Sequence, residues 1–182
     1  MNYTAEMQHT EDSIRRLSAV QYHTFRPGVR LLWLAAGVGS IVGAIYGGAD
    51  QLLFYLLMFA GCWLIMNLNL PAKHRADKII ASAKGTLPHT QFHFREEDFT
   101  VKSSGYEKKI GYRQLYALLE DDRYLYLFLN RNAGYMADKS TLSPGEMSLF
   151  QAALETRSGL DFRKPTTPLN LNLKRFFKPG KK

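Results

Sequence analysis

A single cysteine, Cys62, occurs among the 182 residues of this chain. One thiol excludes an intramolecular disulfide and any zinc site built from several cysteines. No glycine-rich phosphate loop follows a predicted strand, and Ser103, Ser104 and Ser143 fit turns or helix caps rather than a nucleophile beside a base. We therefore expect no catalytic residues, no cofactor and no enzymatic activity.

Candidate metal ligands are also sparse. Two histidines of one predicted strand, His89 and His93, would lie about 13 Å apart in an extended backbone, too far to share an ion. The acidic triplets at 96–98 and 120–122 offer oxygen ligands for calcium, but each fits a turn between strands, where such residues are common. We expect no metal site, and we expect the histidines to face solvent.

Charged residues are absent from two apolar runs, residues 31–46 and 52–70. Nineteen helical residues span roughly 28 Å, close to the hydrocarbon thickness of a bilayer. The pattern predicts a transmembrane helical hairpin over residues 29–70. The other interpretations, a hairpin buried in a soluble core and a cleaved signal peptide, are disfavoured, because the remaining chain is too short to cover two such helices and the first run begins after residue 30.

Basic residues flank the predicted hairpin on both sides, and the loop between the two runs contains none. Those before it are Arg15, Arg16, Arg26 and Arg30, and those after it are Lys73, Arg75, Lys78 and Lys84. Under the positive-inside rule, both chain termini are expected in the cytoplasm and the loop outside. This predicts a multi-pass membrane protein.

Small residues recur at every fourth position of the first apolar run: Ala35, Gly39, Gly43 and Gly47. Such a stripe lets a second helix approach closely. We favour helix packing within the same chain, against Ala60 and Gly61 of the second run. The alternative is a seam between copies of the chain.

Outside the hairpin, the sequence predicts an α+β protein with a small antiparallel β domain. Residues 1–28 form an N-terminal segment with a short helix that begins at 10–13, and residues 71–85 form a basic linker helix. From residue 86 the apolar period changes to two, as in Phe92 and Phe94, and strands follow up to residue 137. Ser143 fits an N-cap, and Glu146 a capping box, of a helix whose apolar face has Met147, Phe150 and Leu154. Residues 86–160 thus predict a bent sheet or barrel capped by a C-terminal helix.

The tail, residues 161–182, carries much of the net charge of +8. Seven of the 24 basic residues lie in residues 163–182, where no acidic residue occurs. An amphipathic helix there would place apolar residues beside cations and contact anionic lipid headgroups, together with the linker. The predicted lipid contacts are Lys73, Arg75, Lys78, Leu169, Leu173, Lys174, Arg175, Phe176, Phe177 and Lys178. The alternatives are a solvated, disordered tail and, less favoured, binding of nucleic acid.

Four stretches carry a resemblance to a known family: ALLEDDRYLYLFL (117–129), the short strand after it (135–137), SPGEMSLFQAAL (143–154) and the acidic helix start at 10–12. In these stretches the sequence resembles the YcxB-like family of bacterial membrane proteins. The resemblance implies a location in the bacterial cytoplasmic (inner) membrane and a pleckstrin-homology-like fold for the C-terminal domain, and it supplies no catalytic residues. We expect a membrane-anchored interaction module that binds an unknown protein partner or its own copies. The alternatives are a sensor of anionic lipid and a small subunit of a transport complex.

Overall fold

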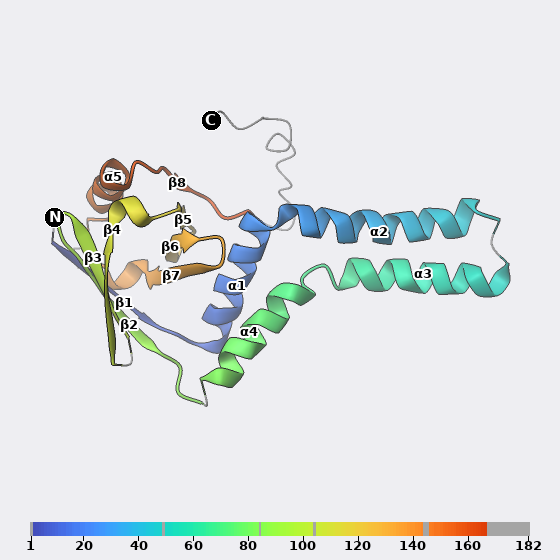
Figure 1. Ribbon diagram of the computed structural model, residues 1–182, viewed down its shortest axis with the longest axis horizontal. Helices are drawn as coiled ribbons and strands as arrows, with labels where there is room; N and C mark the ends of the chain where they lie inside the picture. The colour runs from blue at the N-terminus through green and yellow to red at the C-terminus, as the bar shows by residue number, and fades with distance from the viewer. Residues whose placement is uncertain (1, 49, 84, 104, 144–145, 167–182) are drawn as a thin grey trace.

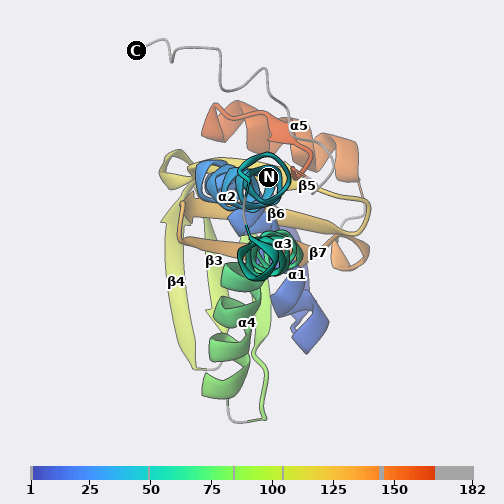
Figure 2. The same cartoon turned by 90° about the vertical axis from the view of Figure 1, so that its right-hand side faces the viewer.

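The computed structural model describes residues 2–48, 50–83, 85–103, 105–143 and 146–166. A β domain lies at one end, and a pair of long helices projects from it (Figure 1). Seen from the free end of that pair, α2 and α3 lie next to each other in front of the β domain (Figure 2). The predicted α+β class with antiparallel sheets is confirmed.

The first strand, β1 (Tyr3–Gln8), leads into α1 (Glu11–Phe25). The start of α1 is the one that the sequence predicts. The Thr10 hydroxyl accepts a hydrogen bond from the Ser13 backbone N–H at 3.2 Å, and the Ser13 hydroxyl accepts one from the Thr10 N–H at 2.9 Å. This reciprocal cap satisfies two of the N–H groups that a helix start leaves unpaired.

Three helices follow: α2 (Pro27–Tyr46), α3 (Gln51–Met66) and α4 (Leu70–Ser82). Among the described residues, α2 is the one helix that is long and apolar enough by itself to cross a membrane. Only 11% of its apolar window is buried, unlike the core helix of a soluble protein. The shorter α3 meets the same criteria only together with α4, from which it is bent by 52°.

The strands form two four-stranded sheets. The remaining strands are β2 (His89–Phe94), β3 (Asp98–Ser103), β4 (Tyr106–Gly111), β5 (Ala117–Glu120), β6 (Tyr124–Asn130), β7 (Ala133–Asp138) and β8 (Phe162–Arg163). One sheet has the order β1-β2-β3-β4 and the other β7-β6-β5-β8, and all pairs are antiparallel except β5 with β8. β1 pairs with β2 along its whole length, so that the N-terminal residues are part of the β domain although α1 to α4 intervene in the sequence.

The inward faces of both sheets and α5 (Met147–Ser158) form the core. Phe92 and Phe94 are fully buried, as their alternation predicts, and so are Phe150 and Leu154 on the inner face of α5. The predicted start of this helix is wrong, however. Ser143 does not cap it, because its backbone N–H and C=O bond with those of Thr4, both at 2.8 Å, and α5 begins at Met147.

Candidate functional site at the base of the helical pair

The turn between β6 and β7 docks onto the helices where the helical pair leaves the β domain. The Gln21 side chain, on α1, donates a hydrogen bond to the Arg131 carbonyl at 2.9 Å. Arg26 donates to the Asn132 side-chain oxygen at 3.1 Å, and Arg75, on α4, donates to the Asn132 carbonyl. The turn is thus held from the end of α1 and from α4 at once, which fixes the β domain relative to the helical pair.

A cleft of about 200 Å³ opens between α1, α4 and this turn. Its wall contains Arg26, Arg75 and Arg131, together with the neutral residues Ser18, Gln21, Tyr22, Pro71 and Ala72. None of the described residues that line it is acidic. The arrangement provides guanidinium donors for an anion.

His23 connects α1 to the break between α3 and α4. Its Nε2 lies 2.9 Å from the Asn69 side-chain oxygen, and the residue is buried. The expectation that the histidines face solvent is therefore wrong at this position, because α1 packs against α4. Burial lowers the pKa of His23; the hydrogen bond to Asn69 opposes this shift, and the nearby Arg30 charge reinforces it.

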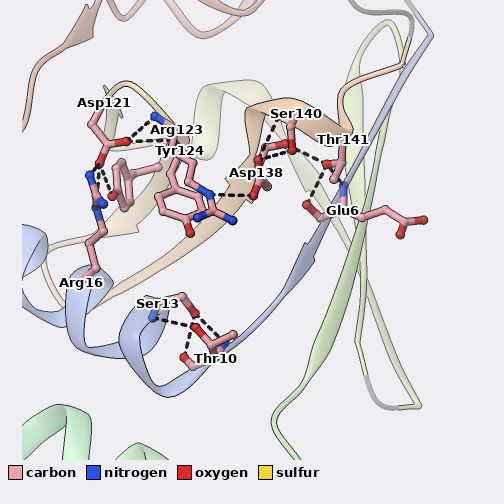
Figure 3. A network of polar contacts seen from close by, with 11 residues as sticks. Glu6, Thr10, Ser13, Arg16, Asp121, Arg123, Tyr124, Asp138, Ser140 and Thr141 are labelled. Carbon is pink, nitrogen blue, oxygen red and sulfur yellow. Dashed lines mark hydrogen bonds and ion pairs between the residues drawn. The ribbon is translucent and has the colours of Figure 1, made fainter.

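A second polar network joins α1 to the tip of the second sheet (Figure 3). The Asp121 carboxylate accepts hydrogen bonds from the Tyr126 hydroxyl at 2.6 Å and from the Tyr124 N–H at 2.8 Å, and Arg16 forms an ion pair with it at 2.9 Å. The acidic triplet at 96–98 also forms an ion pair, since the Asp98 carboxylate lies 3.0 Å from the Lys109 Nζ. Among the described residues, no three His, Cys, Asp or Glu side chains gather as a metal site would require.

The predicted lipid contacts differ in their surroundings. Lys73 and Lys78 are exposed on α4, whereas Arg75 is half-buried and holds the β6–β7 turn. The predicted contacts of the tail lie outside the described residues: Leu169, Leu173, Lys174, Arg175, Phe176, Phe177 and Lys178. The sequence did not indicate that Arg26, Arg131 and Tyr22 lie together. The β6–β7 turn brings Arg131 to α1, but the turn and α1 are far apart in the sequence.

The predicted small-residue stripe does not face α3. Ala35, Gly39 and Gly47 are exposed, and a Cβ added at Gly39 or Gly43 would meet nothing within 4 Å. The prediction that these residues pack against the second helix of the same chain is therefore wrong. Gly61, the predicted partner on α3, does lie in the contact between α2 and α3.

The helix contact uses Gly37 instead. A Cβ added there would lie 2.8 Å from Ile65 Cγ1 and 3.1 Å from the Gly61 carbonyl oxygen. Gly37 is two positions from Gly39, about 200° around a helix, so the two lie on opposite faces. Gly37, Ile41 and Ala44 also follow helical spacing, four and three residues apart. This spacing is the sequence signal that could have identified the face of α2 that packs against α3.

Replacing Gly61 with valine should separate α2 from α3. Its Cβ would lie 2.7 Å from the Gly37 carbonyl oxygen and 2.6 Å from Ile41 Cγ1, a clash with backbone that only movement of a helix relieves. The two tryptophans of the chain report on this contact, since the Trp33 and Trp63 rings lie 6.4 Å apart. We expect the near-ultraviolet circular dichroism of this pair to collapse in Gly61→Val and to persist in the control Gly39→Val. The reverse pattern would refute this seam.

The comparisons with known proteins give one match. Residues 94–154, from the end of β2 to α5, match the model of the YcxB-like protein family. No curated protein and no solved structure matches the chain. The resemblance seen in the sequence is thus confirmed over the strands and capping helix of the β domain.

Proposed function

We propose that this chain, a member of the YcxB-like family through residues 94–154, is a membrane-anchored, non-enzymatic interaction module. The observation that carries the proposal is the exposed apolar surface of the helical pair, whose base is hydrogen-bonded to a β domain. In this proposal, α2 and α3 both cross the bacterial cytoplasmic membrane, and the β domain and both termini lie in the cytoplasm.

The surface of the helical pair supports the anchor. Leu32 and Tyr46 of α2 are 68% and 83% exposed, and Phe59 and Met66 of α3 are 72% and 76% exposed. A contiguous apolar surface of this kind requires lipid or another protein to cover it. The cations that precede and follow the pair in the sequence, and their absence from the loop between the two helices, favour the cytoplasmic placement of the β domain.

The topology supports a pleckstrin-homology-like domain with the helical pair inserted between its first two strands. A four-stranded antiparallel sheet is followed by the meander β5-β6-β7 and by α5, which covers the core. Because β1 and β2 flank the insertion and pair with each other, the two ends of the helical segment return to the same place. Such a domain presents its outer surface to partners at a fixed orientation to the bilayer.

Site-specific photocrosslinking in intact membranes tests the proposal. Leu149 is 58% exposed on the outer face of α5, so a photoreactive residue at this position should trap a discrete protein partner or a second copy of the chain. The same residue at Arg113, exposed beside β5, serves as the control position. Adducts with lipid alone at both positions, or release of the protein from membranes at alkaline pH, would contradict the proposal.

Two other functions are favoured by specific features. The cleft with Arg26, Arg75 and Arg131 favours binding of anionic lipid, the alternative to protein binding. The outward faces of Gly39 and Gly43 leave room for another helix, as in a small subunit of a membrane transport complex. In that case, valine at these two glycines would prevent assembly with a second protein while α2 and α3 stay packed.

A further inference from the structure

The cleft at the base of the helical pair combines positive charge with an unsatisfied hydroxyl. Tyr22 lines it and is 6% exposed, and its hydroxyl oxygen is buried with no hydrogen-bond partner. Leaving a buried polar group unpaired costs about 1–3 kcal/mol. Arg26, one of the three arginines that line the same cleft, acts electrostatically on Tyr22, so positive charge and an unpaired donor occur together at this site, as binding of an anionic oxygen requires.

Each arginine of the cleft is positioned by a neutral partner. Arg26 and Arg75 donate to Asn132, and the Arg131 Nε donates to the Tyr116 hydroxyl at 3.2 Å. A guanidinium group has five N–H donors, and each of these bonds uses one nitrogen. The arginines are thus oriented without a carboxylate that would neutralise them in the cleft.

The larger cavity nearby has a different character. It measures about 560 Å³ and is lined by Arg131 and Arg163, but also by Asp161. Its charges therefore partly compensate one another. The small cleft, by contrast, is lined by three arginines and by Tyr22, with no acidic residue among the described residues that line it.

We propose that this cleft binds the phosphate group of an anionic phospholipid headgroup. Arg26 directly precedes α2, and Pro71 lies at the start of α4, so the cleft sits where the helical pair leaves the β domain (Figure 1). Arginine forks match phosphate oxygens, and the Tyr22 hydroxyl donates to one of them. The choice of a lipid as the source of the phosphate rests on the proposed membrane anchor, because the bilayer headgroups then lie at the level of the cleft.

Binding there would connect three parts of the chain. The phosphate would contact α1 through Tyr22, α4 through Arg75 and the β6–β7 turn through Arg131. The orientation of the β domain would then depend on the anionic lipid content of the membrane, because the ligand adds contacts only when all three parts are docked.

Titration of the full-length protein in neutral detergent tests the site. The probes are dihexanoyl phosphatidylglycerol, dihexanoyl phosphatidylcholine and inorganic phosphate, and the readout is isothermal titration calorimetry. We expect the phosphatidylglycerol to bind, and Tyr22→Phe and Arg131→Ala each to weaken it about tenfold. The matched control is Arg113→Ala, which removes an exposed arginine outside the cleft.

Tyr22→Phe is the decisive variant, because the Tyr22 hydroxyl has no partner within the protein and its loss should not lower the thermal unfolding temperature. Equal affinity of Tyr22→Phe and wild type for the phosphatidylglycerol would overturn the site. Inorganic phosphate that binds as tightly as the phosphatidylglycerol would overturn the assignment to lipid. These measurements use soluble probes, so a failure of the membrane anchor, seen by alkaline extraction, is distinguishable from a failure of the site.

Discussion

Replacing Phe150 with alanine is expected to lower the free energy of unfolding of the β domain by about 3–5 kcal/mol. The Phe150 side chain is fully buried, and its ring meets that of Phe94 edge-on at 4.8 Å between centroids and that of Tyr3 at 5.2 Å. It therefore joins α5 to the first two strands of the sheet. Alanine would leave a cavity that neither strand can fill without breaking their pairing.

The neighbouring Leu149 provides a matched control, since it is exposed on the same helix and Leu149→Ala should change stability by less than about 0.5 kcal/mol. Thermal unfolding of the full-length protein in neutral detergent, followed by circular dichroism of the sheet, measures both variants. We expect a fall in the midpoint of order 10 °C for Phe150→Ala. Equal midpoints for the two variants would show that α5 does not cover the core.

The elements of the β domain could be predicted from local sequence, because their apolar residues alternate. Phe92 and Phe94 gave the inner face of β2, and Met147, Phe150 and Leu154 gave that of α5. The start of α5 could not be predicted in this way. Ser143 has the side chain of a good cap, but its backbone is committed to a bridge with Thr4, a contact between residues far apart in the sequence.

The candidate site depends almost entirely on such distant contacts. Arg131 and Tyr22 reach the same cleft because the β6–β7 turn docks on α1, and no local pattern around either residue indicates this. Within α2, the presence of glycine did not identify the face that packs against α3, because glycines lie on both faces of this helix. Gly39 is exposed and Gly37 is buried against α3, and only the position of the partner helix distinguishes them.

These distant contacts have a common origin in the place of the helical segment. Since β1, before the segment, pairs with β2, after it, the start of α1 and the end of α4 must lie near the same edge of the sheet. Side chains of both helices, Gln21 and Arg75, can therefore hold one turn of the other sheet. A change in the angle between α1 and α4 would be transmitted to the β domain through this turn.

Outside the apolar core, we expect the largest loss of folding stability from removal of one carboxylate at Asp121. The Tyr126 hydroxyl, on a fully buried residue, donates to it, and so do the backbone N–H groups of Arg123 and Tyr124. Asp121→Ala would leave the tyrosine hydroxyl unpaired and Arg16 without its ion pair. We expect a loss of about 2–4 kcal/mol, and little change for the control Asp122→Ala, an exposed neighbour.

The same carboxylate makes stability depend on pH. Burial by itself would raise the pKa of Asp121, but the hydrogen bonds from Tyr126, Tyr124 and Arg123 and the Arg16 charge hold it below the usual range. The folded state therefore binds protons less readily than the unfolded chain, and the stabilisation is present above the unfolded pKa of about 3.9 and is lost as pH falls through the folded pKa.

Chemical unfolding of the full-length protein at pH values between about 2 and 6 measures this dependence. Wild type should lose stability steadily below about pH 4, and Asp121→Asn, which keeps the shape of the side chain without its charge, should be less stable at pH 6 and show a shallower slope. Some slope should remain, because hydrogen bonds from Ser140 and the Arg123 charge outweigh burial and also hold the pKa of Asp138 low. Identical slopes for wild type and Asp121→Asn would mean that the acid sensitivity arises elsewhere, and that the link from α1 to the tip of the second sheet contributes little to the fold.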